Sequence, residues 1–212
     1  MNVQERIEKC AVVPVAAFSS ADEAVKASKA MIAGGVDVVE ITFRTEAAAD
    51  AVAAVSQECP EMLVGAGTIL TAEQAEEAFR CGAQFIVSPG LGKDVIEWCI
   101  ANEVPVYPGA VTPTEITEAI VKYGLNTIKY FPAGLYGGIA GMKALAGPFG
   151  GIRFMPTGGV NAENLEEYLR QPFIFAVGGT WLCSNKALAE GNFKDIEDAC
   201  RVACSIVKKV RG

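Results

Sequence analysis

A lysine lies in the middle of an apolar run, TIKYFPA (127–133). The β-branched and aromatic residues of this run favour a strand, and the proline near its end is typical of a strand's end. Lysine is among the residues least often buried without a partner. If Lys129 is enclosed in such a strand, burial disfavours its charged form, and the side chain can act as an amine nucleophile toward a carbonyl carbon.

Alternation along this strand predicts where Lys129 points. Side chains on a strand face opposite sides in turn, so Thr127, Lys129 and Phe131 share one face. Ile128 and Tyr130 share the other face, which suits apolar packing against helices. Lys129 is therefore expected to point into the space that the sheet encloses.

The same rule applied to VVEITFR (38–44) predicts a second inward charge, because Glu40, Thr42 and Arg44 face inward when the apolar residues 39, 41 and 43 face outward. A structural ion pair between Glu40 and Lys129 is one interpretation. The other is catalytic. The chain has no histidine, which excludes Ser-His-Asp and Cys-His nucleophile systems and a His-ligated metal site. Glu40 is then the candidate acid/base for an imine formed on Lys129.

Short apolar runs alternate with helical segments along the whole chain. The eight runs cover residues 11–18, 38–43, 63–70, 85–90, 104–110, 127–133, 153–160 and 173–182. No linker separates these runs. The pattern favours an α/β fold of the (β/α)8 TIM barrel type, and we expect a single domain over residues 1–212. An open doubly wound sheet is the alternative. Residues 1–9 and 195–210 are expected to form extra N-terminal and C-terminal helices that cover the bottom of the barrel or pack along its side.

Three of the helical segments begin with a capping-box pattern, in which a serine or threonine precedes Glu or Gln by three positions. The pairs are Ser20 with Glu23, Thr71 with Gln74, and Thr112 with Glu115. These pairs predict where the helices start.

Glycine pairs follow the last two predicted strands, in PTGGVNAEN (156–164) and AVGGTW (176–181). The first pair leads into a helix expected to start at Asn161, with its positive end facing outward. Turns after these two strands are the usual phosphate site of this barrel. Arg44 and Thr68 face the same mouth and are candidates to bind a substrate carboxylate. The alternative for Arg44 is a surface side chain paired with Glu46.

Composition narrows the possible partners. The net charge of −7 disfavours nucleic acid, and no apolar run is long enough to span a membrane. The charged N-terminus MNVQERIEKC lacks the core of a signal peptide, so we expect a soluble, cytoplasmic protein. The seven cysteines form no CxxC pair and are expected to be reduced.

Taken together, the motifs VVEITFRT, VGAGT, SPG, IKYFPA, PTGGV and VGGTW make the chain resemble the bacterial 2-keto-3-deoxy-6-phosphogluconate (KDPG) / 4-hydroxy-2-oxoglutarate (KHG) aldolases over nearly its whole length. The resemblance implies a class I, Schiff-base aldolase of the Entner-Doudoroff pathway that needs neither metal nor cofactor. It also implies a homotrimer that cleaves KDPG to pyruvate and glyceraldehyde 3-phosphate.

Carried over residue by residue, the resemblance makes Lys129 the Schiff-base lysine and Glu40 the acid/base. Arg44 and Thr68 hold the pyruvate carboxylate, and Pro89 and Phe131 wall the pyruvyl pocket. The residues expected around the phosphate are Gly158, Gly159, Gly178, Gly179 and Thr180.

The chain departs from the family in the loop after the sixth strand. Members of the family often have an acidic residue after FPA and an asparagine before the next GG, where this chain has Gly134 and Tyr136. The preferred aldehyde therefore stays open. The alternatives are an aldolase for the galactonate epimer, an isomerase or decarboxylase of phosphorylated sugars, and a barrel that binds phosphate ligands without catalysis. Arg44 and PTGG favour the gluconate type.

Overall fold

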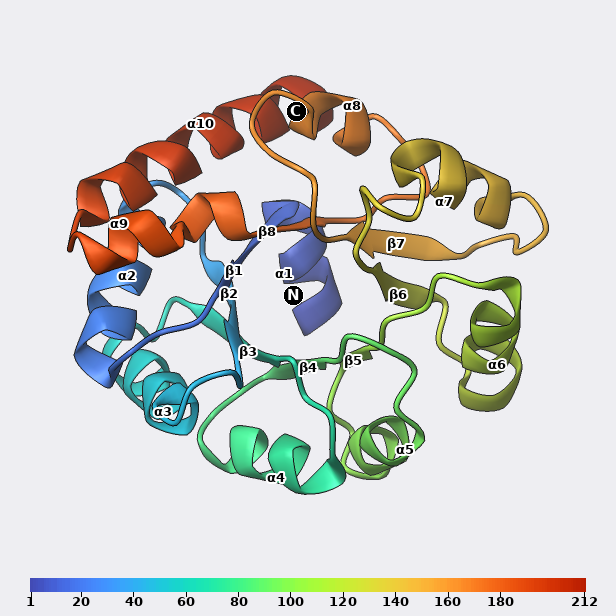
Figure 1. Ribbon diagram of the computed structural model, residues 1–212, viewed down its shortest axis with the longest axis horizontal. Coiled ribbons are helices and arrows are strands. Elements are labelled where there is room, and N and C mark those ends of the chain that lie inside the picture. Colours follow the sequence, from blue (N-terminus) through green and yellow to red (C-terminus); the bar gives the residue numbers. More distant parts are fainter.

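The computed structural model describes residues 1–212, in which strands alternate with helices around a ring (Figure 1). The strands are β1 (Val12–Ala16), β2 (Val38–Thr42), β3 (Leu63–Gly67), β4 (Phe85–Val87), β5 (Val106–Tyr107), β6 (Thr127–Tyr130), β7 (Arg153–Pro156) and β8 (Val177–Gly179). The helices are α1 (Val3–Cys10), α2 (Ala21–Ala33), α3 (Ala48–Glu58), α4 (Ala72–Arg80), α5 (Lys93–Ala101), α6 (Pro113–Tyr123), α7 (Gly138–Ala146), α8 (Leu165–Leu169), η1 (Thr180–Cys183, a 3-10 turn), α9 (Asn185–Ala189) and α10 (Phe193–Arg211).

All paired strands are parallel and close into a barrel. Six strands pair in the order β5-β4-β3-β2-β1-β8, and β6 pairs with β7. Isolated parallel bridges between Gly109 and Lys129 and between Thr157 and Gly178 join the two sheets. The (β/α)8 barrel predicted from the sequence is confirmed, and the open sheet is wrong. Catalytic groups of this fold lie at the C-terminal ends of the strands, which we call the mouth.

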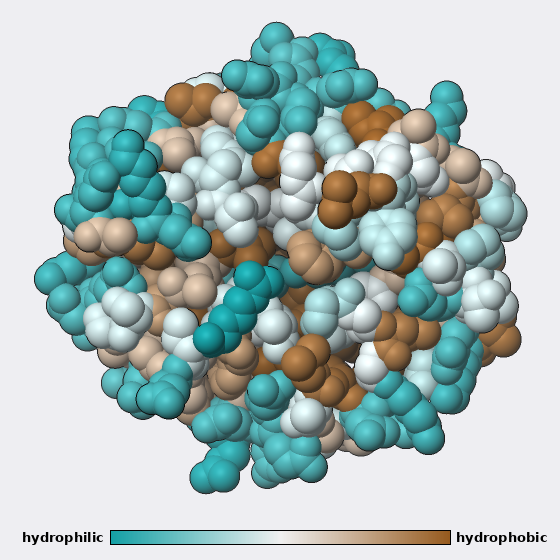
Figure 2. Space-filling view, viewed as in Figure 1, coloured by the Kyte–Doolittle hydropathy of each residue, from teal (hydrophilic) through white to brown (hydrophobic).

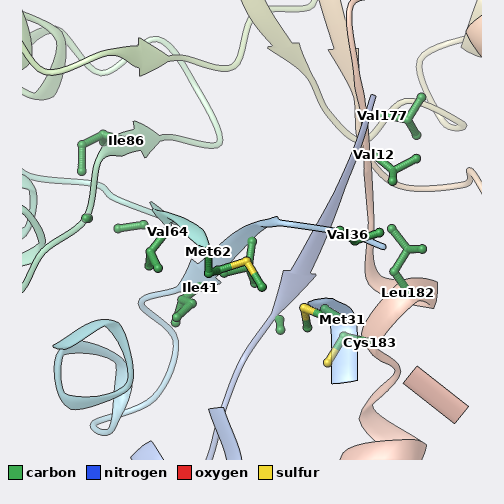
Figure 3. Close-up of a cluster of buried hydrophobic side chains, with 14 of the residues drawn as sticks. Val12, Met31, Val36, Ile41, Met62, Val64, Ile86, Val177, Leu182 and Cys183 are labelled. Carbon is green, nitrogen blue, oxygen red and sulfur yellow. The ribbon is translucent and has the colours of Figure 1, made fainter. Parts of the chain in front are cut away.

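Two apolar clusters separate the outside of the barrel from its inside. The larger cluster lies between strands and helices and includes the outward residue Ile41 (Figure 3). Ile128 and Tyr130 belong to the same cluster. The smaller cluster fills the barrel's lower interior with inward residues such as Phe85 and Met155. Alternation therefore assigns the strand faces correctly.

The two terminal helices take different positions. Helix α1 covers the N-terminal end of the ring, which we call the floor, and its Ile7 belongs to the inner cluster (Figure 1). Helix α10 packs along the side, next to α2 and α8 (Figure 1). At its end, Arg211 donates hydrogen bonds to the carbonyl oxygens of Ile174 and Phe175. None of the helices combines the length and apolarity that a membrane crossing requires. The cytoplasmic location stays a prediction.

The predicted helix caps are present, but at α2 and α4 the Glu or Gln side chain bonds to the residue before the cap instead of to the cap itself. Thr112 and Glu115 form a complete capping box at the start of α6. At α2 the Ser20 side chain accepts from the N–H of Glu23, but the Glu23 carboxylate reaches past the cap to Ser19. At α4, Gln74 likewise accepts from the N–H of the residue before Thr71.

Several elements are shorter than predicted. Strand β5 contains only two residues because Pro105 and Pro108 flank it and proline cannot donate to a strand ladder. Strand β8 contains three residues, and the chain turns into a 3-10 helix at Thr180. The helix expected from Asn161 is regular only from Leu165. The Asn161 side chain accepts hydrogen bonds from the N–H groups of Glu163 and Asn164, as a cap does, in the turn that leads into this helix.

Candidate active site

The centre of the site is a buried ion pair between β6 and β2. The Lys129 Nζ lies 2.9 Å from Oε1 and 3.3 Å from Oε2 of Glu40. Lys129 is 5% exposed and Glu40 is fully buried. Both predicted inward charges therefore meet inside the barrel, above the apolar cluster that fills its floor. In this setting the carboxylate is placed to take a proton from the ammonium, which frees an amine for attack.

Strand β3 makes room for Glu40 by carrying glycine at its end. A Cβ on Gly67 would lie 2.2 Å from Glu40 Oε1, so no larger residue fits there without displacing the carboxylate. On the same strand, Gly65 makes room in this way for the ring of Phe85. The second glycine of the VGAGT motif thus sets the position of the Glu40 carboxylate. Sequence reasoning missed this role for Gly67, although the small-residue pattern was visible.

Arg44 and Thr68 come together at the mouth, as predicted. Arg44 Nε donates to Thr68 Oγ1 at 3.1 Å. Thr68 has a φ of 58°, a left-handed conformation that costs free energy in a non-glycine residue and that often occurs at functional sites. The expectation that Arg44 points inside the barrel is wrong, because β2 ends at Thr42 and the chain turns there, which leaves the Arg44 side chain exposed.

Phe131 and Pro89 flank the lysine at different distances. Lys129 Nζ lies 5.6 Å from the centroid of the Phe131 ring. Pro89 is one step further away, since its carbonyl oxygen packs against Gly109, which in turn bridges to Lys129. Both residues are half-buried at the same end of the barrel.

The two glycine pairs lie side by side at the mouth. Gly178 bridges to Thr157, the residue directly before Gly158 and Gly159. Gly158 and Gly159 both have a φ of 87°, which only glycine adopts readily. Gly179 ends β8, and the exposed Thr180 follows it at the start of the 3-10 turn η1. In the space-filling view, hydrophilic residues ring the periphery over the helices, and paler and apolar residues gather toward the centre (Figure 2).

Thr157 lies beside the predicted site residues, between Gly178 and the end of β6, and the sequence reasoning did not single it out. Its hydroxyl is buried and has no hydrogen-bond partner. Two residues earlier, Met155 points into the barrel and pairs in register with Lys129. The alternation rule that placed Lys129 would have placed Thr157 on the same inner face. The Thr157 hydroxyl packs against Gly178 of the neighbouring strand.

No group of three or more Cys, Asp or Glu residues lies close enough together to hold a metal ion. All seven cysteines are free. Burial raises the pKa of the Cys99 and Cys183 thiols to about 12, which makes them poor nucleophiles at neutral pH.

Comparison with known proteins agrees with this geometry. The model of the family described as KDPG and KHG aldolase matches residues 3–199. The chain belongs to the KDPG and KHG aldolase family.

Relatives in the family are similar over nearly their full length. A 2-dehydro-3-deoxy-phosphogluconate aldolase from Treponema pallidum is 42% identical over 207 residues, which cover 98% of each chain. The KHG/KDPG aldolase of Escherichia coli is 41% identical over 91% of this chain and 90% of its own. A solved KDPG aldolase from Legionella pneumophila, with pyruvate captured as a covalent carbinolamine, superimposes with a TM-score of 0.91 at 33% identity, over 96% of this chain and 98% of that one.

Proposed function

We propose that the protein is a class I aldolase that cleaves KDPG to pyruvate and glyceraldehyde 3-phosphate, and 4-hydroxy-2-oxoglutarate to pyruvate and glyoxylate. The observation that carries this proposal is the buried pair of Lys129 and Glu40 at the strand ends of a barrel that belongs to the KDPG and KHG aldolase family. Family membership disfavours the isomerase, decarboxylase and purely binding alternatives.

In the first half of the reaction, Glu40 takes a proton from Lys129, and the neutral amine adds to the C2 carbonyl of the substrate. The resulting carbinolamine loses water to give a protonated imine. Arg44 and Thr68 hold the substrate carboxylate at the mouth, which their 3.1 Å contact favours. Such positioning aligns the C3–C4 bond with the imine.

In the second half, a base removes the proton from the C4 hydroxyl, and the C3–C4 bond breaks. Its electrons pass to the imine and form an enamine, while the aldehyde leaves. Protonation of the enamine at C3 and hydrolysis of the imine then release pyruvate and restore the amine. Glu40, directly or through a water, moves these protons.

We place the substrate phosphate against Gly158, Gly159, Gly178, Gly179 and Thr180. These residues lie together on two neighbouring strand ends, where backbone N–H groups can approach an anion closely. The N–H groups of Glu163 and Asn164 are used by Asn161 and are left out of this site.

The experiment that tests the function is a cleavage assay in which pyruvate release is followed with lactate dehydrogenase. KDPG, its galactonate epimer and 4-hydroxy-2-oxoglutarate are compared at equal concentrations. We expect the highest kcat/KM with KDPG. A higher kcat/KM with the epimer would assign the enzyme to the galactonate type instead. If none of the three substrates released pyruvate, the proposal would be overturned.

We also propose that three copies of the single-domain barrel form a homotrimer. An apolar surface supports this proposal, since Phe79 on α4, Trp98 and Ile100 on α5, and Val121 on α6 lie on neighbouring helices. The rings of Phe79 and Trp98 meet edge to face at 6.0 Å, and Val121 is 79% exposed. Exposed apolar side chains of this kind, when they gather on one side of a molecule, often mark an interface.

Light scattering after gel filtration tests the trimer. Val121→Glu is expected to lower the measured mass, because a buried charge in an interface is costly. Val202→Glu, on an exposed position of α10, is the matched control and should leave the mass unchanged. A monomeric wild-type protein would contradict the proposal.

A further inference from the structure

Tyr130 is the neighbour of Lys129 on β6, and its buried side chain makes a hydrogen bond to a loop. It follows Lys129 directly on β6, and its side chain points outward, into the apolar cluster between strands and helices. It is 2% exposed, yet its hydroxyl is partnered: Oη donates to the carbonyl oxygen of Tyr136 at 2.5 Å. An outward residue of the catalytic strand therefore reaches the loop between β6 and α7.

The same loop forms one wall of the mouth through its backbone. The N–H of Ala133 donates to the carbonyl of Thr157, and the N–H of Gly134 donates to the carbonyl of Gly158, at 2.8 Å and 3.0 Å. The Cα of Gly134 also packs closely against Gly159. The position of the β6–α7 loop and that of the glycine turn after β7 are thus coupled.

Backbone hydrogen bonds shape the tip of the loop, from the N–H groups of Leu135 and Tyr136 to the carbonyl oxygen of Pro132, but its side chains add little. Leu135 is 87% exposed and Tyr136 is 50% exposed, so their side chains contribute little packing. Around the hydroxyl of Tyr130, in contrast, the fit is tight. A Cβ on Gly141 would lie 2.7 Å from Tyr130 Oη and 2.3 Å from the Tyr136 carbonyl oxygen. The glycine at 141 keeps this space open for the hydrogen bond.

We propose that Tyr130 is a positioning residue that fixes the β6–α7 loop, and through it the Gly158–Gly159 turn, for substrates that carry a distal phosphate. The inference rests on the proposed function, because it assumes that the phosphate lies against this turn. Tyr130 does not touch the reacting atoms. Through the loop, its hydroxyl affects binding of the aldehyde end of the substrate, and binding of the pyruvyl end does not depend on it.

The test is Tyr130→Phe, assayed with KDPG and, separately, by exchange of the pyruvate methyl protons in deuterated water. We expect KM for KDPG to rise about five- to tenfold, as for the loss of one hydrogen bond that orders a binding loop. The exchange, which requires only the imine and enamine on Lys129, should stay at the wild-type rate. Hydrogen exchange of the amides between 133 and 141 should become faster.

The matched control is Tyr107→Phe. Tyr107 is also a buried tyrosine, but its hydroxyl has no hydrogen-bond partner, and its ring packs on the floor between Phe85 and Phe175. Removing this hydroxyl should leave both readouts unchanged. Gly141→Ala is a second variant that disturbs the same contact, and it should reproduce the selective rise in KM.

Equal losses in KDPG cleavage and pyruvate exchange, or no change in either, would overturn the role of Tyr130. Failure of pyruvate exchange in the wild-type protein is a different result, which would overturn the aldolase mechanism itself. The two failures are therefore distinguishable.

Discussion

Two ion pairs mark the opposite ends of the barrel and differ in exposure. At the mouth, Lys129 and Glu40 are almost completely enclosed, with side chains 7% and 0% exposed. At the floor, Arg153 at the start of β7 makes a two-pronged contact with Glu8 of α1, and these side chains are 30% and 41% exposed. The floor pair keeps much of its hydration and joins α1 to the barrel.

The difference in exposure predicts a different role for each pair. An enclosed ion pair loses hydration free energy that its mutual attraction barely offsets, so apolar residues of similar volume would serve stability as well. The mouth pair therefore points to chemistry, whereas the floor pair has a modest effect on stability. The predictions below separate the two pairs, from the largest effect to the smallest.

Lys129→Met should remove the nucleophile and lower kcat for KDPG by more than about 10³-fold, because no imine can form. Lys143→Met, on the exposed face of α7, is the matched lysine control and should retain wild-type kcat. Wild-type turnover in Lys129→Met would show that the buried lysine is structural.

Glu40→Gln keeps the shape of the side chain but removes the base. We expect kcat to fall by about 10²- to 10⁴-fold, the usual contribution of a positioned acid/base, while pyruvate still binds. Assays of KDPG cleavage measure the fall in kcat. Protection of the variant by pyruvate against inactivation measures whether pyruvate still binds. Unchanged turnover would exclude Glu40 as the essential acid/base.

Gly67→Ala tests the position of Glu40 without changing either charge. The added Cβ would lie 2.2 Å from the carboxylate, so Glu40 must move, and a shift of this size can lower kcat by about 10²-fold. Gly150→Ala is the control, since nothing lies within 4 Å of its added Cβ. Equal activity in the two variants would contradict the proposed tight fit.

Arg153→Met should leave kcat unchanged and lower the free energy of unfolding by less than about 1 kcal/mol, because both partners are partly exposed and screened by solvent. Chemical denaturation of the variant measures this loss. A large loss of kcat would mean that the floor pair contributes to the site.

The floor pair also predicts a pH dependence. The hydrogen bond from Arg153 lowers the pKa of Glu8 below 4.5, with burial acting in the opposite direction. A carboxyl whose pKa is lower in the folded protein contributes stability above its unfolded pKa, and this contribution is lost as the pH falls through the folded value. Stability should therefore fall less below pH 4.5 in Glu8→Gln than in the wild-type protein. Parallel curves would contradict this assignment.

Alternation along the strands predicted much of the fold and the central pair. Lys129 and Glu40 could be placed inside the barrel because Ile128 and Ile41 must face the helices. The alternation rule no longer predicts side-chain direction where the chain leaves the strand. Arg44 lies beyond the end of β2, and its orientation depends on a turn and on Thr68, which is distant in sequence.

Contacts made by side chains with the backbone also escaped the sequence reasoning. Asn161 caps the turn that leads into α8, and the helix is regular only from Leu165, which a glycine-to-helix pattern does not reveal. The place of Gly67 under Glu40 depends on the register between β2 and β3, in which Glu40 pairs with Gly65. Register is a property of the assembled sheet.

The most direct test of the account is to incubate the protein with pyruvate and sodium borohydride and to locate the reduced adduct by peptide mass spectrometry. We predict an adduct on Lys129 in the wild-type protein and in Arg153→Met, and none in Lys129→Met. An adduct on an exposed lysine such as Lys208, or no adduct at all, would contradict the imine mechanism at the mouth.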